Sequence, residues 1–287
     1  MRVLLVGASG QLGFEVKRQM QAGFTLMLPS SRQLDIRSAE QVAKALRELK
    51  PDLIINAAAF TAVDQAEQEP EQAFAVNERG VKHLAQSNLP IVHLSTDYVF
   101  NGELQRPYRE EDKPAPLNSY GQSKLAGEKA LTAVNPRHLI LRTGGLFGVH
   151  GNNFVKAILY KAQNRQLLTV VNDQFSTPTP APALAKAIGQ LAKHYREQAK
   201  LPWGIYHFGG QPAVSWYEFA VTIAEQALIL GLLKQRPEII AIKSADYPGA
   251  VCRPRYSALD SGLLQRSLGL SPPDWRDGLR QMLAQLA

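Results

Sequence analysis

Short apolar segments alternate with amphipathic ones through the first half of the chain. Five apolar segments predict strands: Arg2–Val6, Phe24–Leu28, Leu53–Asn56, Ile91–Ser95 and His138–Arg142. They are apolar at nearly every position, which is typical of a sheet covered on both faces. Strands that alternate with helices indicate a parallel sheet with right-handed crossovers. We therefore expect an α/β fold with a doubly wound parallel sheet.

The intervening segments have helical spacing and recognisable ends. Leu12, Val16 and Met20 lie on one side of a helix predicted over Gln11–Ala22. Ser38 is an expected N-cap for a helix that ends near Leu49. Two more helices are predicted, from Pro70 to about Ser87 and over Leu117–Val134.

The pattern is less regular after Gly144. The glycines at 144, 145, 148 and 151 predict a loop. Further helices are expected at about 153–163, 181–195, 216–230 and 275–286, with short strands near 167–171, 204–208 and 239–243. This region predicts a smaller C-terminal α/β lobe, so we divide the chain into residues 1–145, with about 175–212 returning to that domain, and a second lobe built mainly from 146–287.

Composition narrows the class of protein. The 287 residues, 45% of them hydrophobic, suffice for a large core. The longest apolar runs, such as Leu53–Ala59, are too short to span a bilayer, and the N-terminus reads as a strand rather than an export signal. We therefore expect no membrane partner and a cytoplasmic location. The lone Cys252 excludes an intrachain disulfide and is expected to be a packed side chain rather than a nucleophile.

The formal net charge of +7 favours anionic ligands. Lys and Arg are scattered, without a run of five, so a nucleic-acid partner is not expected. Small phosphate-bearing ligands fit the charge better, although part of it is ordinary surface solvation.

A glycine-rich loop follows the first predicted strand and opens the first helix. Its residues are Gly7-Ala8-Ser9-Gly10-Gln11-Leu12-Gly13. Glycine permits the tight turn and lets backbone amides approach a diphosphate, and the helix N-terminus adds unpaired N–H groups. Gly13 would permit close packing of helix on strand. We predict that Gly7, Ser9, Gly10, Gln11, Leu12 and Gly13 bind a dinucleotide.

The end of the second strand is expected to contact the adenosine ribose. An acidic residue about 20 residues past the glycines binds this ribose in NAD-dependent proteins. No acid occurs here before Asp35, whereas Ser31 and Arg32 suit a 2′-phosphate. The sequence therefore favours NADPH over NADH, although NADH is not excluded. The alternative is that Arg32 is simply a solvent-exposed side chain in a turn.

A second set of residues suggests carbonyl chemistry. Tyr120 and Lys124 are four apart on a predicted helix and so share a face. Thr96 follows the fourth strand, at the carboxyl edge of the sheet. A nearby ammonium is expected to lower the pKa of a tyrosine that donates a proton, and a hydroxyl can bind a carbonyl oxygen as charge develops there.

The G-x-x-G-x-x-G loop, with Thr96 and Tyr-x-x-x-Lys in this order, resembles the extended short-chain dehydrogenase/reductase family. The resemblance implies a Rossmann-type first domain and the catalytic residues Thr96, Tyr120 and Lys124. It also implies that Tyr120 and Lys124 contact the cofactor, with Lys124 on the nicotinamide ribose. Further cofactor contacts are implied beside the adenine and after the third strand, at Asp35, Ile36, Ala57, Ala58 and Ala59.

Longer blocks are similar to the dTDP-4-dehydrorhamnose reductase family. They lie at residues 59–67, 95–102, 120–128, 151–154, 173–175, 178–179 and 253–257, and are spread over almost the whole chain. The resemblance implies hydride transfer from NADPH to C4 of a dTDP-linked keto-sugar, with a proton from Tyr120. It also implies substrate contacts at Thr61, Val63, Asp64, Asp97, Tyr98, Asn153 and Arg253, with Arg253 on the diphosphate.

Some positions depart from the family pattern. The family often has Arg-Thr-Ser-Trp where this chain has Arg142-Thr143-Gly144-Gly145, so an aromatic residue that packs on the sugar is missing. Some relatives pair through acidic residues and magnesium. Glu15 is present but residues 179–183 contain no acid, so no metal ligand is assigned and a magnesium requirement stays open. A monomer or a homodimer is expected.

Other activities share the fold and the motif set. Sugar-nucleotide dehydratases have a sequence similar to Thr-Asp-Glu at the position where this chain has Thr96-Asp97-Tyr98. An epimerase shows no net redox change. A non-catalytic subunit, similar to the methionine adenosyltransferase regulatory subunit, retains much of the motif set. The reductase is favoured over all three.

Overall fold

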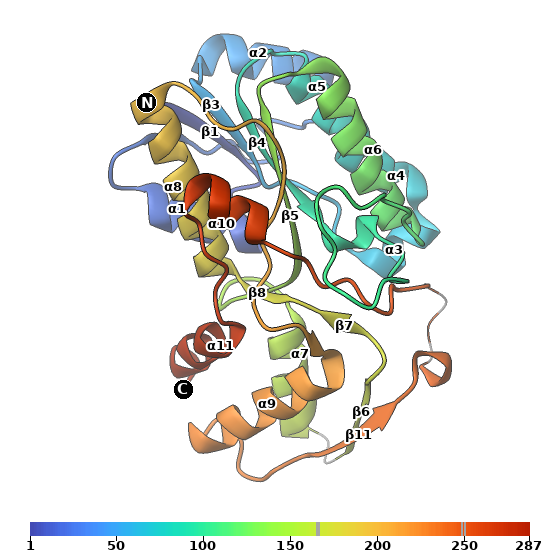
Figure 1. Ribbon diagram of the computed structural model, residues 1–287. Coiled ribbons are helices and arrows are strands. Elements are labelled where there is room, and N and C mark those ends of the chain that lie inside the picture. Colours follow the sequence, from blue (N-terminus) through green and yellow to red (C-terminus); the bar gives the residue numbers. More distant parts are fainter. Residues whose placement is uncertain (165–166, 248, 250) are drawn as a thin grey trace.

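The computed structural model describes residues 1–164, 167–247, 249 and 251–287 (Figure 1). Its main feature is a seven-stranded parallel sheet with the order β2-β1-β3-β4-β5-β8, in which β9 also pairs with β5. The strands are β1 (Arg2–Val6), β2 (Thr25–Met27), β3 (Leu53–Asn56), β4 (Ile91–Thr96), β5 (His138–Phe147), β8 (Pro178–Pro180) and β9 (Gly204–His207). The predicted doubly wound fold is confirmed.

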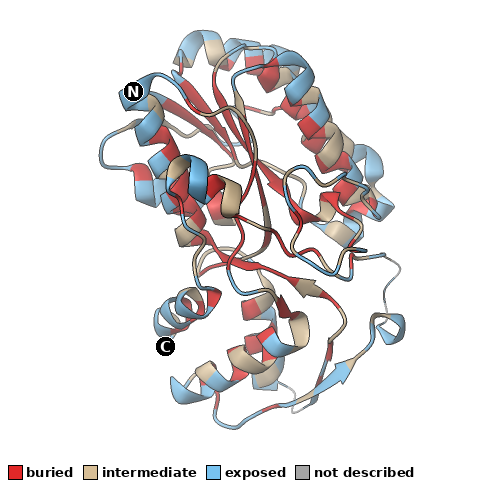
Figure 2. Ribbon diagram, viewed as in Figure 1, coloured by how far each residue is buried: buried red, intermediate tan, exposed pale blue. Residues whose placement is uncertain are grey.

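Alternation along β1 explains how one sheet supports two helical layers. Val3 and Leu5 pack in a core with α1 (Gln11–Met20) and α8 (Ala181–Gln198). Leu4 and Val6 face the opposite layer. That layer contains α2 (Ala39–Leu49), α5 (Gly80–Ala85) and α6 (Ser119–Val134). Successive side chains of a strand point to opposite faces, so an apolar strand fills both layers (Figure 2).

The helix predicted from Pro70 is present but is not uniform. It comprises α4 (Pro70–Phe74), a π-helical turn over Ala75–Arg79, and α5. A shorter helix, α3 (Val63–Gln68), precedes it and was not predicted. Asn77 in the π turn donates to Ser123 Oγ of α6 at 2.9 Å. The irregular turn therefore connects this helix to the one that carries Tyr120 and Lys124.

The loop predicted from Gly144 onward does not begin where the sequence indicated. Strand β5 continues through Gly144 and Gly145 to Phe147, paired with β8 and with a register shift between Gly144 and Leu146. Glycine has little intrinsic strand preference. The partner strand comes from more than thirty residues away, so no local pattern could indicate it.

The second lobe lies beyond the carboxyl ends of the strands (Figure 1). It contains α7 (Phe154–Asn164), α9 (Trp216–Ile229), α11 (Trp275–Ala284), the parallel pair β6 (Leu167–Val171) and β11 (Glu238–Ile242), and the antiparallel pair β7 (Phe175–Ser176) and β10 (Val214–Ser215). It has its own core around Phe147, Phe219 and Trp275. The unpredicted α10 (Gly262–Leu268) packs back on the first lobe through Leu264. In the described residues, no helix is both long and apolar enough to cross a membrane.

Candidate active site

The glycine loop makes a close junction between β1, β3 and α1. Gly7 has φ +82°, and a Cβ there would lie 2.6 Å from the backbone nitrogen of Ala58. A Cβ on Gly13 would lie 2.1 Å from the carbonyl oxygen of Gly7. The N-cap Gly10 places no side chain over the first turn of α1. Amides at this helix end are therefore open to a diphosphate, the group that a dinucleotide presents.

The loop after β3 is held by a buried polar pair. Asn56 Oδ1 accepts from the Ala58 backbone at 3.2 Å, and Asn56 Nδ2 is 3.1 Å from Nδ1 of the fully buried His93. Ala57, Ala58 and Ala59 are half-buried beside the glycine loop. Small side chains at these positions leave room for a planar ligand.

The residues predicted to contact the adenosine lie after β2, and the structure places them in different surroundings. Ile36 is buried against Gly80. The carboxylate of Asp35 is bound by Arg37 at 2.7 Å, and this hydrogen bond lowers the pKa of Asp35. Ser31 and Arg32 are exposed, and Arg32 lines a surface hollow together with Lys44. Lys44 is a second cation that sequence reasoning missed, because its spacing fits an ordinary exposed helix position.

Thr96, Tyr120 and Lys124 come together at the carboxyl edge of the sheet. Tyr120 and Lys124 share one face of α6, and Thr96 ends β4. Lys124 is 2% exposed and its Nζ donates to the Leu94 carbonyl oxygen at 2.6 Å. Burial lowers the pKa of Lys124 to about 8, while the Glu128 carboxylate acts in the opposite direction.

We predicted that Lys124 lowers the pKa of the tyrosine, but the structure does not show this effect. Burial raises the pKa of Tyr120 to about 12, and a hydrogen bond with Thr96 lowers it only in part. The Lys124 amine is turned to the Leu94 carbonyl, and Asp97 adds a negative charge near the ring. The phenol of Tyr120 is therefore protonated at neutral pH.

A buried ion pair lies behind Lys124. Glu128 accepts from Arg142 Nε at 2.9 Å and Nη2 at 2.6 Å, and from Ser95 Oγ at 2.5 Å. Both partners of the ion pair have side chains no more than 3% exposed. This bidentate pair connects α6 with β5 and β4, the elements that position Lys124 and Thr96.

Asp97 was predicted to contact substrate, but its carboxylate faces protein hydroxyls. It accepts from Ser257 Oγ at 2.5 Å, Ser176 Oγ at 3.3 Å and Thr96 Oγ1 at 3.1 Å. Asp97 is 2% exposed, and burial raises its pKa to about 6. The residue joins segments 79 and 160 positions away and orients the Thr96 hydroxyl.

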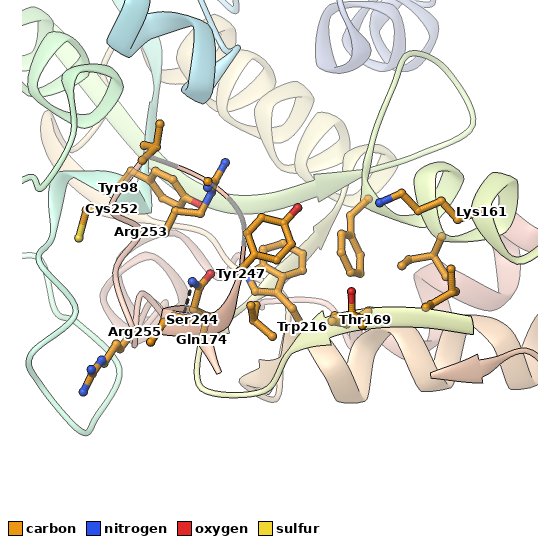
Figure 3. Close-up of a pocket in the computed structure, with 18 of the residues that line it drawn as sticks. Tyr98, Lys161, Thr169, Gln174, Trp216, Ser244, Tyr247, Cys252, Arg253 and Arg255 are labelled. Carbon is orange, nitrogen blue, oxygen red and sulfur yellow. Dashed lines mark hydrogen bonds between the residues drawn. The ribbon is translucent and has the colours of Figure 1, made fainter. Parts of the chain in front are cut away.

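A cavity of about 690 Å³ opens between the lobes (Figure 3). That volume is typical of a small-molecule site. Tyr98 lies at one end, where its ring meets that of Tyr120 at 5.9 Å. Arg253 lines the same end and pairs with Asp64 at 2.7 Å. The cavity therefore runs from Tyr98, the ring neighbour of Tyr120, into the second lobe.

Other predicted substrate residues lie elsewhere. Asn153 donates to Gln11 Oε1 at 3.0 Å and to the Gly148 carbonyl oxygen at 2.8 Å, which places it at the glycine loop. Thr61 is exposed and Val63 is half-buried at the start of α3. In the described ranges, no three His, Cys, Asp or Glu side chains are arranged to hold a metal ion.

Several lining residues were missed by sequence reasoning. Gln174, Trp216, Ser244 and Tyr247 face the cavity from three separate segments of the second lobe (Figure 3). Gln174 donates to Ser244 Oγ at 2.9 Å. Gln174 lies in the family block at 173–175 but was not assigned to the site, and only the folded lobe brings it together with the other three.

Comparison with known proteins agrees with this geometry. The RmlD substrate-binding domain family matches residues 1–287. The dTDP-4-dehydrorhamnose reductase of Aggregatibacter actinomycetemcomitans is 41% identical, with 99% of this chain and 98% of that protein covered. This chain belongs to the dTDP-4-dehydrorhamnose reductase family. The resemblance inferred from the sequence is thereby confirmed.

Solved structures of this family have the same fold. A dTDP-4-dehydrorhamnose reductase from Clostridium acetobutylicum superimposes with a TM-score of 0.92 at 34% identity, covering 100% of this chain and 99% of that one. The Bacillus anthracis enzyme, solved in complex with NADP, gives a TM-score of 0.91 at 32% identity over 99% of each chain.

Proposed function

We propose that this protein reduces the 4-keto group of dTDP-4-dehydrorhamnose with NADPH and forms dTDP-L-rhamnose. The placement of Tyr120 and Lys124 on one face of α6, against Thr96 at the end of β4, carries this proposal. Membership of the reductase family supports the substrate, and the NADP complex of a family member supports the cofactor.

The glycine loop and the N-terminus of α1 fit the diphosphate of NADPH, since a Cβ at Gly7 or Gly13 would collide with backbone. Arg32, with Lys44 beside it, would bind the 2′-phosphate. The bound nicotinamide supplies the hydride that reaches sugar C4. No role for magnesium is proposed.

Tyr120 donates the proton to the sugar oxygen. Its raised pKa keeps the phenol protonated until the carbonyl oxygen gains charge. The hydroxyl of Thr96 has a single proton, which it donates to Asp97 in this structure, so it would turn that proton to the same oxygen to stabilise the developing charge. Lys124 supplies positive charge beneath the site and would bind the nicotinamide ribose with an N–H group not used by the Leu94 carbonyl.

Arg253 is proposed to bind the dTDP diphosphate. Its Nη2 is held by Asp64, and a guanidinium has five N–H donors in all. The remaining donors at the cavity end suit phosphate oxygens. Tyr98 stands where the dehydratase pattern has glutamate, so the acid expected for elimination is missing from this position.

The decisive assay follows NADPH oxidation with the purified protein and enzymatically generated dTDP-4-keto-L-rhamnose, with NADH in parallel. Sugar-dependent loss of NADPH is expected. If neither NADPH nor NADH is oxidised although NADPH is measured to bind, the reductase activity is contradicted and a non-catalytic role is favoured.

Tyr120→Phe is expected to lower kcat by about 10²- to 10⁴-fold, the usual contribution of a positioned proton donor. NADPH affinity should stay near that of the wild type, as measured by titration calorimetry. Activity within a fewfold of the wild type would exclude Tyr120 as the donor.

A further inference from the structure

Asn118 connects the helix that carries Tyr120 to the segment that carries Arg253. It is the N-cap of α6, where its Oδ1 accepts from the Gly121 backbone nitrogen at 2.9 Å. Its Nδ2 donates to the Cys252 carbonyl oxygen, also at 2.9 Å. The side chain is 1% exposed, so both hydrogen bonds are shielded from water. One amide group therefore fixes the start of α6 to a backbone segment 134 positions away.

The Cys252 carbonyl belongs to the peptide group that leads into Arg253. Both residues line the cavity at the same end as Tyr98, whose ring meets that of Tyr120 (Figure 3). A donor to this carbonyl holds the peptide plane from which the Arg253 side chain starts. The guanidinium is the group proposed to bind the substrate diphosphate, so Asn118 acts on that group through the backbone.

A second set of contacts joins the same two segments through α3. Arg253 Nη2 donates to Asp64 at 2.7 Å. Three residues further along α3, Glu67 accepts from the Ser119 backbone nitrogen at 2.8 Å and from Ser119 Oγ at 2.7 Å. Both carboxylates are exposed, whereas the amide of Asn118 is buried, so water competes least with the amide. Ser119 follows Asn118, and the contacts therefore form a closed ring between Arg253 and the start of α6.

We propose that Asn118 is a positioning residue that holds Arg253 at a fixed distance from Tyr120. This inference rests on the proposed function. The diphosphate and the reacting carbon belong to one substrate molecule, so binding at Arg253 brings the carbonyl to Tyr120 only if the two side chains keep their spacing. A displacement of about 1 Å can lower a rate by about 10²-fold. Asn118 thereby converts binding of the diphosphate into alignment of the reacting carbonyl.

The test removes the donor to the Cys252 carbonyl and keeps the helix cap. Asn118→Ser keeps a good N-cap but is too short to reach this carbonyl, and Asn118→Asp keeps an accepting oxygen but its carboxylate has no donor. We expect either variant to weaken dTDP by about fivefold in titration calorimetry, the usual contribution of one hydrogen bond. The kcat for the keto-sugar should fall by about tenfold or more. NADPH affinity should be unchanged.

A double-variant cycle with Arg253→Ala separates positioning from a merely structural role. If Asn118 acts through Arg253, then Asn118→Ser should change dTDP affinity by less than about twofold once the guanidinium is gone. Equal losses in the wild-type and Arg253→Ala backgrounds would overturn the proposal. Unchanged dTDP affinity in both Asn118 variants would overturn it as well.

Asn135→Ser is the matched control at the other end of the same helix. Asn135 is fully buried at the C-terminal end of α6, and its Nδ2 donates to the Leu89 carbonyl oxygen at 2.7 Å. This variant should lower the Tm at least as much as Asn118→Ser, but leave dTDP affinity and kcat near those of the wild type. If it weakens dTDP as much as Asn118→Ser does, the effect is one of stability and the proposal fails.

The same measurements separate this inference from the proposed function. A wild-type protein that binds dTDP but does not reduce the keto-sugar would overturn the reductase, and the dTDP cycle would still decide the role of Asn118. A wild-type protein that does not bind dTDP would overturn both.

Discussion

At the scale of the residue, the buried amine of Lys124 has a pKa that is strongly altered by its surroundings. Burial favours the neutral amine and lowers its pKa from 10.5 to about 8, although Glu128 opposes this change. The amine therefore loses its proton as the pH rises through about 8, whereas an exposed lysine keeps it until well above pH 10.

This pKa predicts the pH dependence of the reaction. Because Lys124 acts as a cation, kcat/KM for the keto-sugar should fall as the pH rises through about 8. Rates measured between pH 6 and 10 in one buffer system would show this limb. Lys124→Arg keeps the charge across the range, so any residual activity should lack the limb. If kcat/KM of the Lys124→Arg variant falls over the same pH range, another group is responsible for the pH dependence.

Arg32 allows a separate prediction about cofactor choice. Charged hydrogen bonds contribute about 1.5–3 kcal/mol, so Arg32→Ala should weaken NADPH by about 10- to 100-fold and leave NADH unchanged. Titrations of both cofactors measure this selectivity. Equal losses for NADPH and NADH would exclude the 2′-phosphate as its partner. Arg37→Ala is a suitable control, because Arg37 pairs with Asp35 instead.

At the scale of the element, the Glu128–Arg142 pair determines how α6 sits on the sheet. The two guanidinium hydrogen bonds and the Ser95 hydroxyl satisfy a carboxylate that is almost fully buried. Removing one partner of such a pair leaves a buried charge without compensation. The pair therefore stabilises the arrangement in which α6 carries Tyr120 and Lys124 to the end of β4.

Arg142→Met is expected to lower the free energy of unfolding by about 3–5 kcal/mol. Chemical denaturation would measure the loss. The exposed Arg236–Glu225 pair provides the control, and Arg236→Ala should change stability far less. The double variant Glu128→Gln/Arg142→Met completes the test. If it loses as much unfolding free energy as the two single variants added together, the two side chains do not act as a pair.

Sequence patterns located most elements but not their irregularities. Ser38 does cap α2, through a hydrogen bond from the Gln41 backbone, and β3 and β6 have the predicted bounds. These signals are local, because a cap and an apolar run involve neighbouring residues. The π turn before Gly80 and the extension of β5 were missed because contacts with distant segments produce them.

At the scale of the whole molecule, the site lies where two cores meet. One lobe contributes the glycine loop and the Tyr120 region, and the other contributes Trp216 and Gln174. The net charge of +7 attracts anionic ligands to the molecule as a whole.

That charge predicts a salt dependence. The Kd for dTDP, measured by calorimetry, should rise severalfold between roughly 0.05 and 0.5 M NaCl, as screening lengths shorten from about 14 to 4 Å. dTMP carries less charge and should show a shallower dependence. Equal slopes for dTDP and dTMP would mean that the outer phosphate gains nothing from the cationic surface.

The sequence by itself determined the alternation of strands and helices in the first half, the glycine loop, and the spacing of Tyr120 and Lys124, because these depend on residues close together in the chain. Family blocks extended this to the activity. Only the tertiary structure decided that Asp97 accepts a hydrogen bond from Thr96 and that Arg253 pairs with Asp64. The second of these contacts joins distant segments, and burial, which sets the pKa values of Tyr120 and Lys124, exists only in the folded chain.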